Sequence, residues 1–206
     1  MAIDIYLMRH GEVDKHPELE YTIDALNVDG TNQTLKIAKE LFLRDIDSII
    51  SSPFKRTIQT AQLISDEIGI EVKLDPDFTE LSRGIYTERP YEEFLEVWKG
   101  YNFDFDYVPP EGESVNQGRR RIVRGISNLI NSGLNKLLIV THAGVISNLL
   151  MMLYDFDFEY GKPNYGGLCR IHYSGNVFKL VSAESQYLQL NEDQSADSSK
   201  LIQFLK

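Results

Sequence analysis

The stretch IDIYLMRHG, residues 3–11, decides how the chain is expected to fold. Its first six residues are mostly apolar and rich in branched or aromatic side chains, and the run stops abruptly at a polar cluster, which predicts a buried strand. Residues 137–141 (LLIVT) repeat this pattern and end at a second histidine, while residues 47–51 (DSIIS) end at Ser52-Pro53. Strands of this kind, with helical segments between them, indicate a largely parallel sheet covered on both faces.

The segments between these strands carry helical signals. Ser114 and Gln117 have capping-box spacing at the start of a helix over 114–132, and Gly69 is placed to end a helix that Ser52 caps. The remaining elements are expected at 31–43, 71–74, 145–154, 168–173 and 177–183. The predicted fold class is therefore α/β, a three-layer sandwich with a mostly parallel central sheet, helices on both faces and an antiparallel edge strand.

The domain organisation is expected to be simple. A length of 206 residues favours one domain, placed over 1–190 and followed by a polar C-terminal tail over 191–206. Leu201, Ile202 and Phe204 are the residues that could dock this tail. Residues 86–110 contain prolines, a glycine and many aromatics, and we expect an irregular excursion over the sheet edge, either a substrate lid or a packed surface loop.

The composition excludes several classes of function. A chain with 42% hydrophobic and 25% charged residues is globular, and its net charge of −10 disfavours nucleic acid and anionic membranes as partners. The arginines at 119–121 and 124 are expected to fan around the exposed side of a helix, with pairing of Arg121 to acidic residues as the alternative. No apolar run approaches the ~18 residues that span a bilayer. The lone Cys169 suits a reducing compartment, so a cytoplasmic location is expected, while monomer and homodimer both stay open.

Polar residues follow the predicted strands at the points where they end. Arg9, His10 and Gly11 follow the first strand, and His142 and Ala143 follow the strand at 137–141. Ligands of open α/β sheets bind at the carboxyl ends of the strands, so these residues are expected to meet there. Arg56 lies in the first turns of the helix beyond the third strand and completes the group. Two guanidiniums, two histidines and helix N-termini form a cationic pocket suited to a phosphate dianion.

The chemistry expected at this pocket is nucleophilic. An unperturbed histidine pKa of about 6.5 leaves an unprotonated ring nitrogen available at neutral pH, so His10 can attack phosphorus. Expulsion of an alcohol then needs a proton donor, and Glu80, which follows the predicted strand 71–74, is the candidate. The histidines at 10, 16, 142 and 172 lack metal-ligand spacing, and no P-loop motif occurs, so neither a metal nor another cofactor is expected.

The motifs LMRHGE (7–12), SSPxxRxxxTA (51–61), ELxxG (80–84) and VTHAGVI (140–146) resemble those of the histidine phosphatase superfamily, also called the phosphoglycerate-mutase-like family. The resemblance implies that His10 is the nucleophile that becomes phosphorylated and that Glu80 is the general acid. It also implies that Arg9, Arg56 and His142 form the phosphate pocket, that no metal is needed, and that the partner is a small phosphorylated metabolite.

The sequence also departs from the family pattern. Val13-Asp14-Lys15-His16 replaces the usual Thr and Trp-Asn, so His16 is a candidate for the phosphate contact of that Asn, and Ala143 stands where glycine is common. The short interval from Glu80 to His142 favours a metal-independent phosphatase over a cofactor-dependent phosphoglycerate mutase. A phosphatase of protein phosphohistidine and a non-catalytic phosphate-binding module are further alternatives. Candidate substrates are a sugar phosphate, a phosphoglycerate, α-ribazole phosphate and phosphoserine.

Overall fold

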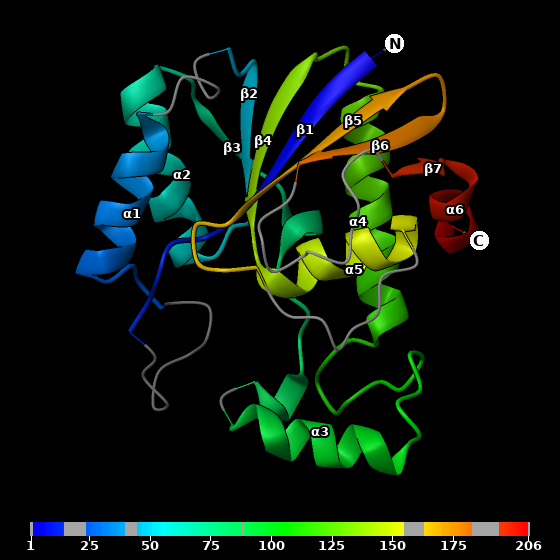
Figure 1. Ribbon diagram of the computed structural model, residues 1–206. Helices are drawn as coiled ribbons and strands as arrows, with labels where there is room; N and C mark the ends of the chain where they lie inside the picture. The colour runs from blue at the N-terminus through cyan, green and yellow to red at the C-terminus, as the bar shows by residue number, and fades with distance from the viewer. Residues whose placement is uncertain are drawn as a thin grey trace.

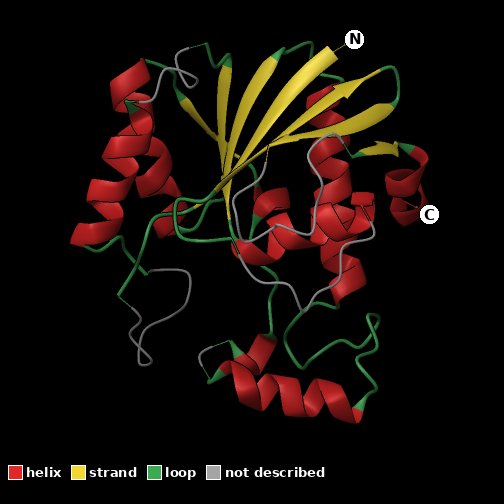
Figure 2. Cartoon of the chain, viewed as in Figure 1, coloured by secondary structure: helices red, strands yellow, loops and turns green. Residues whose placement is uncertain are grey.

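One twisted sheet of seven strands organises the chain and lies between two layers of helices (Figures 1 and 2). This architecture comes from a computed structural model, which describes residues 2–14, 24–39, 45–87, 89–154, 163–182 and 194–205. The strand order across the sheet is β3-β2-β4-β1-β5-β6-β7. The predicted α/β sandwich is confirmed.

The sheet has a parallel half and an antiparallel half. The strands are β1 (Ala2–Arg9), β2 (Ser48–Ser51), β3 (Val72–Leu74), β4 (Lys136–Thr141), β5 (Leu168–Ser174), β6 (Val177–Ser182) and β7 (Ser195–Asp197). The first four of these pair in parallel, whereas β5, β6 and β7 each run antiparallel to the preceding strand of the order. The antiparallel edge that the sequence predicts, with elements at 168–173 and 177–183, is present as β5 and β6, and β7 extends it by one more strand.

The helices cover both faces of the sheet, and the central parallel strands β2 and β4 are buried on both sides. They are α1 (Val28–Ala38), α2 (Lys55–Ile68), α3 (Tyr91–Gly100), α4 (Val115–Ile130), α5 (Ala143–Tyr154) and α6 (Ser199–Ile202), with short 3₁₀ turns η2 (Pro76–Phe78), η3 (Gly84–Tyr86) and η6 (Gln203–Leu205). On one face Met8 packs in a cluster with Ala61 and Ile64 of α2. On the other face Leu7 shares a core with residues of α4 and α5, such as Ile126.

The helix ends confirm part of the sequence interpretation and correct another part. Ser114 caps α4 in a capping box with Gln117, and Gly69, at a φ of 75°, ends α2. Ser52 does not cap α2, whose N-cap is Phe54 without a side-chain hydrogen bond. The Ser52 hydroxyl instead accepts a hydrogen bond from His142, as described below. Likewise, α1 begins at residue 28 instead of 31, where Asn27 accepts from the amide of Gly30.

The excursion over 86–110 contains a helix that sequence reasoning missed. Phe94 and Trp98, one turn apart on α3, are buried and stack with ring centroids 5.8 Å apart. Trp98 also packs edge-on against Phe103, at 5.4 Å between centroids. In Figure 1, α3 lies apart from the two helix layers, beyond the carboxyl ends of the parallel strands. The excursion therefore carries a small aromatic core of its own.

The C-terminal segment is part of the sheet rather than a polar tail. Ala196 of β7 pairs with Phe178 of β6, which adds a seventh strand to the sheet. Leu201 on α6 is 4% exposed and packs into the main core, whereas Ile202 is 52% exposed. The fold therefore continues through the described residues 194–205, beyond the boundary at 190 that we expected.

Two leucine-size side chains in this segment test its contribution to stability. Leu201→Ala removes buried methyl groups and is expected to lower the free energy of unfolding by about 2–3 kcal/mol. Ile202→Ala, the exposed control, should cost less than about 0.5 kcal/mol. Urea unfolding followed by circular dichroism measures both, and equal, small losses would mean that residues 199–205 do not pack in solution.

Candidate active site

The register of the parallel strands brings three loops to the same level at one edge of the sheet. Arg9 pairs with Thr141 across β1 and β4, and Ser51 pairs with Val140 across β2 and β4. The amide of His10 donates to the carbonyl of Thr141 at 3.0 Å. The residues that directly follow β1, β2 and β4 are therefore His10, Ser52 and His142, and they lie next to one another.

The guanidinium of Arg56 lies between the two histidines. Its Nε donates to Nε2 of His10 at 3.2 Å, and its Nη2 contacts Nδ1 of His142 at 3.1 Å. The two imidazole centroids are 5.4 Å apart. Arg56 is 1% exposed, so its charge lies inside the protein and not at the surface. The sequence prediction that these three residues meet at one edge agrees with this geometry.

These contacts define which nitrogen of His10 carries the proton. Nδ1 of His10 lies 2.8 Å from the carbonyl oxygen of Gly11, which can only accept, so Nδ1 bears the hydrogen. Nε2 accepts from Arg56 and therefore holds the lone pair. The ring is neutral and presents the nucleophilic nitrogen toward the guanidinium.

His142 has the opposite tautomer. A guanidinium can only donate, so Nδ1 of His142 accepts from Arg56, and Nε2 then donates to the hydroxyl oxygen of Ser52 at 2.8 Å. The rings of Phe54 and His142 pack in a T-shaped arrangement, with their centroids 5.1 Å apart. Both ring nitrogens of His142 are thus hydrogen-bonded, which fixes its orientation.

Burial and positive charge keep both histidines neutral. Burial is the main cause that lowers the pKa of His10 well below its ordinary value, and the charge of Arg56 adds to it. The pKa of His142 is also lowered well below that value, first by burial and then by Arg56. A neutral His10 at physiological pH is the form that a nucleophile requires.

Arg9 supplies a second cation beside His10. Its Nη1 donates to the carbonyl of Pro163 at 2.7 Å, and the Tyr165 ring lies 3.8 Å from its Cζ. The ring of Tyr165 also lies 5.6 Å from that of His10. The Nε of Arg9 is buried and has no hydrogen-bond partner within the described part of the chain, so an N–H of this cation is available to an anion.

Small residues allow the backbone to come close at two points of the site. The amide of Gly11 donates to Thr60 at 3.0 Å, and a Cβ at position 11 would lie 2.7 Å from the carbonyl oxygen of Gly30. Ala143 is buried at the first position of α5, directly after His142. The tight packing at Gly11 fixes the loop that holds His10.

Glu80 reaches the N-terminus of α5, next to His142. Its Oε2 accepts from the amide of Gly144 at 3.1 Å, and its Oε1 accepts from the amide of Leu81 at 2.9 Å. A Cβ at position 144 would lie 2.2 Å from Oε1, so only glycine leaves room for the carboxylate there. The carboxylate is thereby held at the amide of Gly144, two residues after His142 in the sequence.

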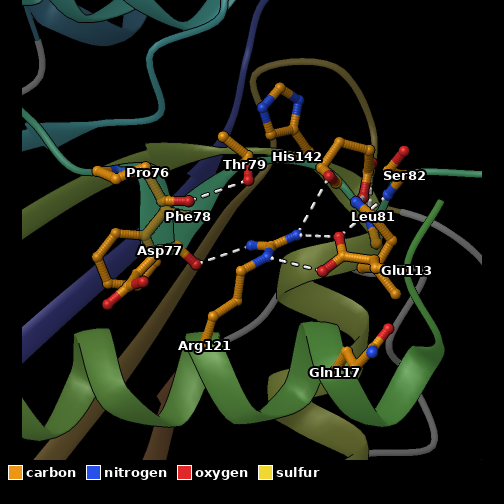
Figure 3. Close-up of polar contacts among 12 residues, drawn as sticks. Pro76, Asp77, Phe78, Thr79, Leu81, Ser82, Glu113, Gln117, Arg121 and His142 are labelled. Carbon is orange, nitrogen blue, oxygen red and sulfur yellow. Dashed lines mark hydrogen bonds and ion pairs between the residues drawn. The ribbon is translucent and has the colours of Figure 1, made fainter. Parts of the chain in front are cut away.

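Arg121 of α4 fixes the loop that carries Glu80 (Figure 3). It donates to both oxygens of Glu113, at 3.1 and 2.6 Å, and to the backbone carbonyls of Asp77 and Glu80, at 2.9 and 3.2 Å. Figure 3 shows its guanidinium between Asp77 and Glu113. The expected pairing of Arg121 with an acid is confirmed. Arg119 does not lie on the exposed side, because it is 8% exposed and donates to Asn148.

Several site features were not found from the sequence. Tyr165, which covers Arg9, follows no predicted strand, and Ser52 was interpreted only as a helix cap. His16 lies outside the described residues, so its predicted phosphate contact stays a prediction. Within the described segments, His, Cys, Asp and Glu side chains form no cluster that could hold a metal ion. None of the helices in these segments has the length and hydrophobicity of a membrane-spanning helix.

Comparisons with known proteins agree on one family. A model of the histidine phosphatase superfamily, branch 1, matches residues 5–186. "Putative phosphoserine phosphatase 2" of Hydrogenobacter thermophilus is 26% identical over 86% of this chain and 93% of its own length. "Probable phosphoglycerate mutase GpmB" of Yersinia enterocolitica is 30% identical over 73% of this chain and 74% of its own length. The structure named "putative alpha-ribazole-5'-P phosphatase" from Escherichia coli superposes with a TM-score of 0.77 at 23% identity, over 90% of this chain and 98% of that chain.

The lowered pKa values predict how stability changes with pH. Below a pH of about 6.5 the unfolded chain binds protons at these two histidines and the native state does not, so the native state loses stability as the pH falls. Between about pH 7.5 and 5.5 the native state is therefore expected to lose stability through both histidines. His10→Gln, which retains an acceptor for Arg56, should remove the contribution of His10 and make this pH dependence smaller. Urea unfolding at both pH values measures it, and an unchanged dependence would contradict the neutral state of His10.

Proposed function

The chain belongs to the histidine phosphatase superfamily, and on that premise we propose that it hydrolyses small phosphate monoesters through a phosphohistidine formed on His10. One observation carries this proposal: the lone pair of Nε2 on a buried, neutral His10 points at the guanidinium of Arg56. The proposed nucleophile, His10, is thus in direct contact with Arg56, the cation proposed to bind the phosphate. The relatives whose names include a phosphatase activity support the same reaction class.

Phosphate binding replaces the contacts that Arg56 makes with the histidines. Phosphate oxygens are charged acceptors and take guanidinium N–H groups more strongly than neutral imidazole does. When Arg56 turns its Nε–H to the phosphate, the lone pair on Nε2 of His10 is released for attack. Arg9 contributes its unpartnered Nε–H to the same group. An anion beside His142 also favours the protonated form of that ring, which then donates through Nδ1.

The first chemical step forms a bond between phosphorus and Nε2 of His10 and breaks the bond between phosphorus and the ester oxygen. Protonated Glu80 gives its proton to the departing oxygen, which leaves as an alcohol. The Nδ1–H of His10 stays hydrogen-bonded to the carbonyl of Gly11, which stabilises the positive charge that develops on the ring. Arg9 and Arg56 stabilise the charge on the equatorial oxygens.

The second step returns the enzyme to its first state. Glu80, now a carboxylate, takes a proton from water, and the water oxygen attacks phosphorus as the bond to Nε2 breaks. Inorganic phosphate leaves, and His10 regains its lone pair. Each step uses groups that the chain itself supplies, and two guanidiniums provide the charge stabilisation that a metal ion provides elsewhere.

A phosphoglycerate mutase is the second candidate, because one relative with this name is 30% identical over most of the chain. Such an enzyme forms the same phosphohistidine but returns the phosphoryl group to another hydroxyl. The interval from Glu80 to His142 holds one helix of the excursion, α3, before α4 begins. We propose hydrolysis because a short excursion leaves water access to the phosphoenzyme, and formation of free phosphate from a phosphoglycerate distinguishes the two activities.

Replacement of His10 tests the nucleophile. His10→Gln should reduce the turnover of p-nitrophenyl phosphate at least 1,000-fold in the presence of excess chelator, because no other group at the site can take its role. His172→Gln is the matched control, since His172 pairs with Asp4 on β1 outside the site, and it should keep the wild-type rate. If His10→Gln keeps more than one-tenth of the wild-type turnover rate, or if chelation abolishes the activity of the wild-type protein, the proposed mechanism is wrong.

Replacement of Glu80 tests the acid. Glu80→Gln keeps an oxygen that can accept from the Gly144 amide at the α5 N-terminus, loses the acceptor for the Leu81 amide, and has no acidic proton to give to an alkoxide. We expect turnover of glycerol 3-phosphate, whose alcohol is a poor leaving group, to fall at least 100-fold. Turnover of p-nitrophenyl phosphate, whose leaving group needs little protonation, should fall less than tenfold. The exposed Glu67→Gln is the control and should change neither rate. Equal losses on the two esters would assign the acid to another residue.

A further inference from the structure

Residues 163–167 (PNYGG), directly before β5, are bound to the end of β1. The amide of Gly166 donates to the carbonyl oxygens of Arg9 and His10, at 3.1 Å in both cases. The amide of Arg9 donates in return to the carbonyl of Gly167 at 3.0 Å. In Figure 1 this segment passes the carboxyl end of β1 on the side of α1. It therefore fixes the backbone from which Arg9 and His10 project.

Contacts with α1 and within the segment hold Tyr165 in place. Nε2 of Gln33, on α1, donates to the carbonyl of Tyr165. The amide of Gly167 donates to the carbonyl of Asn164 at 2.9 Å, which closes a turn. Gly166 has a φ of 70°, and a Cβ there would lie 2.9 Å from Cδ of Gln33, so the turn favours glycine. The backbone of Tyr165 is thus positioned by a helix on one side and by a turn on the other.

The side chain of Tyr165 lies against the guanidinium of Arg9. The Cζ atom of Arg9 is 3.8 Å from the centroid of the ring, which is the distance of direct contact between a guanidinium and an aromatic face. Nη1 of the same guanidinium donates to the carbonyl of Pro163 at 2.7 Å. One contact places the guanidinium on the ring, and the other fixes which of its nitrogens faces the segment 163–167.

These contacts leave one edge of the Arg9 guanidinium open. Nε is buried and has no hydrogen-bond partner among the residues that the structure describes. Nη2, the other nitrogen of this edge, also donates no hydrogen bond within that part of the chain. An edge with two parallel N–H groups matches two oxygens of one phosphate. The rings of Tyr165 and His10 are 5.6 Å apart, so the stacked guanidinium and the proposed nucleophile are neighbours of the same tyrosine.

We propose that Tyr165 is a positioning residue, which holds Arg9 on its ring with the Nε–Nη2 edge turned toward the phosphate. This inference rests on the proposed function, since phosphate is the anion that Arg9 would bind there. An arginine side chain that rotates freely loses conformational entropy when it binds an anion. The contacts with Tyr165 and Pro163 impose this cost during folding, before the substrate arrives. Loss of the ring should therefore weaken phosphate binding although no charge is removed.

Substitutions at position 165 test the role of the ring. Tyr165→Leu should raise KM at least fivefold for glycerol 3-phosphate, which has no aromatic group of its own to stack, and change kcat less than threefold. Calorimetry should find inorganic phosphate bound at least fivefold more weakly. Tyr165→Ser, a second variant without the ring, should give the same losses, whereas Tyr165→Phe should stay within twofold of the wild type. Tyr101→Leu replaces an exposed tyrosine at the end of α3, and this control should change none of these quantities.

A double substitution shows whether Tyr165 acts through Arg9. Arg9→Gln removes the guanidinium, so the addition of Tyr165→Leu should weaken the binding of inorganic phosphate less than twofold further. A further loss as large as the loss in the wild-type background would mean that Tyr165 acts by a route that does not include Arg9, and the proposal would be wrong. Equal losses in Tyr165→Leu and Tyr165→Phe would also overturn it, because the hydroxyl group and not the ring would then be responsible.

The activity of the wild-type protein separates this proposal from the proposed function. If the wild-type protein hydrolyses glycerol 3-phosphate and Tyr165→Leu binds inorganic phosphate as tightly as the wild type, the role of Tyr165 is wrong and the proposed function stays. If the wild-type protein binds phosphate but hydrolyses no phosphate ester, and Tyr165→Leu binds phosphate at least fivefold more weakly, the proposed function is wrong and Tyr165 keeps its role.

Discussion

The guanidinium of Arg56 is held between two neutral imidazoles, and the reactive state of the site depends on that contact. Burial, and then the charge of Arg56, keep both rings unprotonated, and two N–H groups of Arg56 select opposite tautomers, so that His10 keeps its lone pair on Nε2. Removing a guanidinium from water is costly, and the imidazole nitrogens of His10 and His142 accept two of its hydrogen bonds. In the proposed reaction the phosphate oxygens take these N–H groups in place of the imidazoles.

The rest of the fold supports this arrangement from two sides. Parallel pairing of β1, β2 and β4 places His10, Ser52 and His142 next to one another at one edge of the sheet. The register of the sheet therefore positions His10, the proposed nucleophile. Glu80, the proposed acid, is held differently, on a loop that α4 fixes through Arg121 and that reaches the N-terminus of α5. The proposed nucleophile and the proposed acid are therefore supported by different elements of the fold.

The sequence predicts most of the sheet and of the phosphate pocket because both follow from local patterns. Apolar runs that stop at Arg9-His10 and at His142 fix the strand ends, and parallel strands leave few alternatives for where those ends meet. The α3 helix was missed because Pro90, Gly100 and the surrounding aromatics mask a one-turn spacing of Phe94 and Trp98. The position of Tyr165 over Arg9 depends on tertiary contacts between distant segments, which no local pattern encodes. Leu201, which the sequence offers as a docking residue of the C-terminal segment, is buried in the main core, whereas the short strand β7 is too polar in sequence to be recognised from a local pattern.

Direct observation of the histidine side chains tests whether His10 and His142 are both neutral and have opposite tautomers. Long-range ¹⁵N–¹H NMR spectra of the phosphate-free protein at about pH 7 report the protonation of each ring nitrogen. We predict that His10 carries its proton on Nδ1 alone and His142 on Nε2 alone, and that both spectra stay unchanged down to about pH 5.5. An imidazolium at either position at neutral pH, or a proton on Nε2 of His10, would contradict the account.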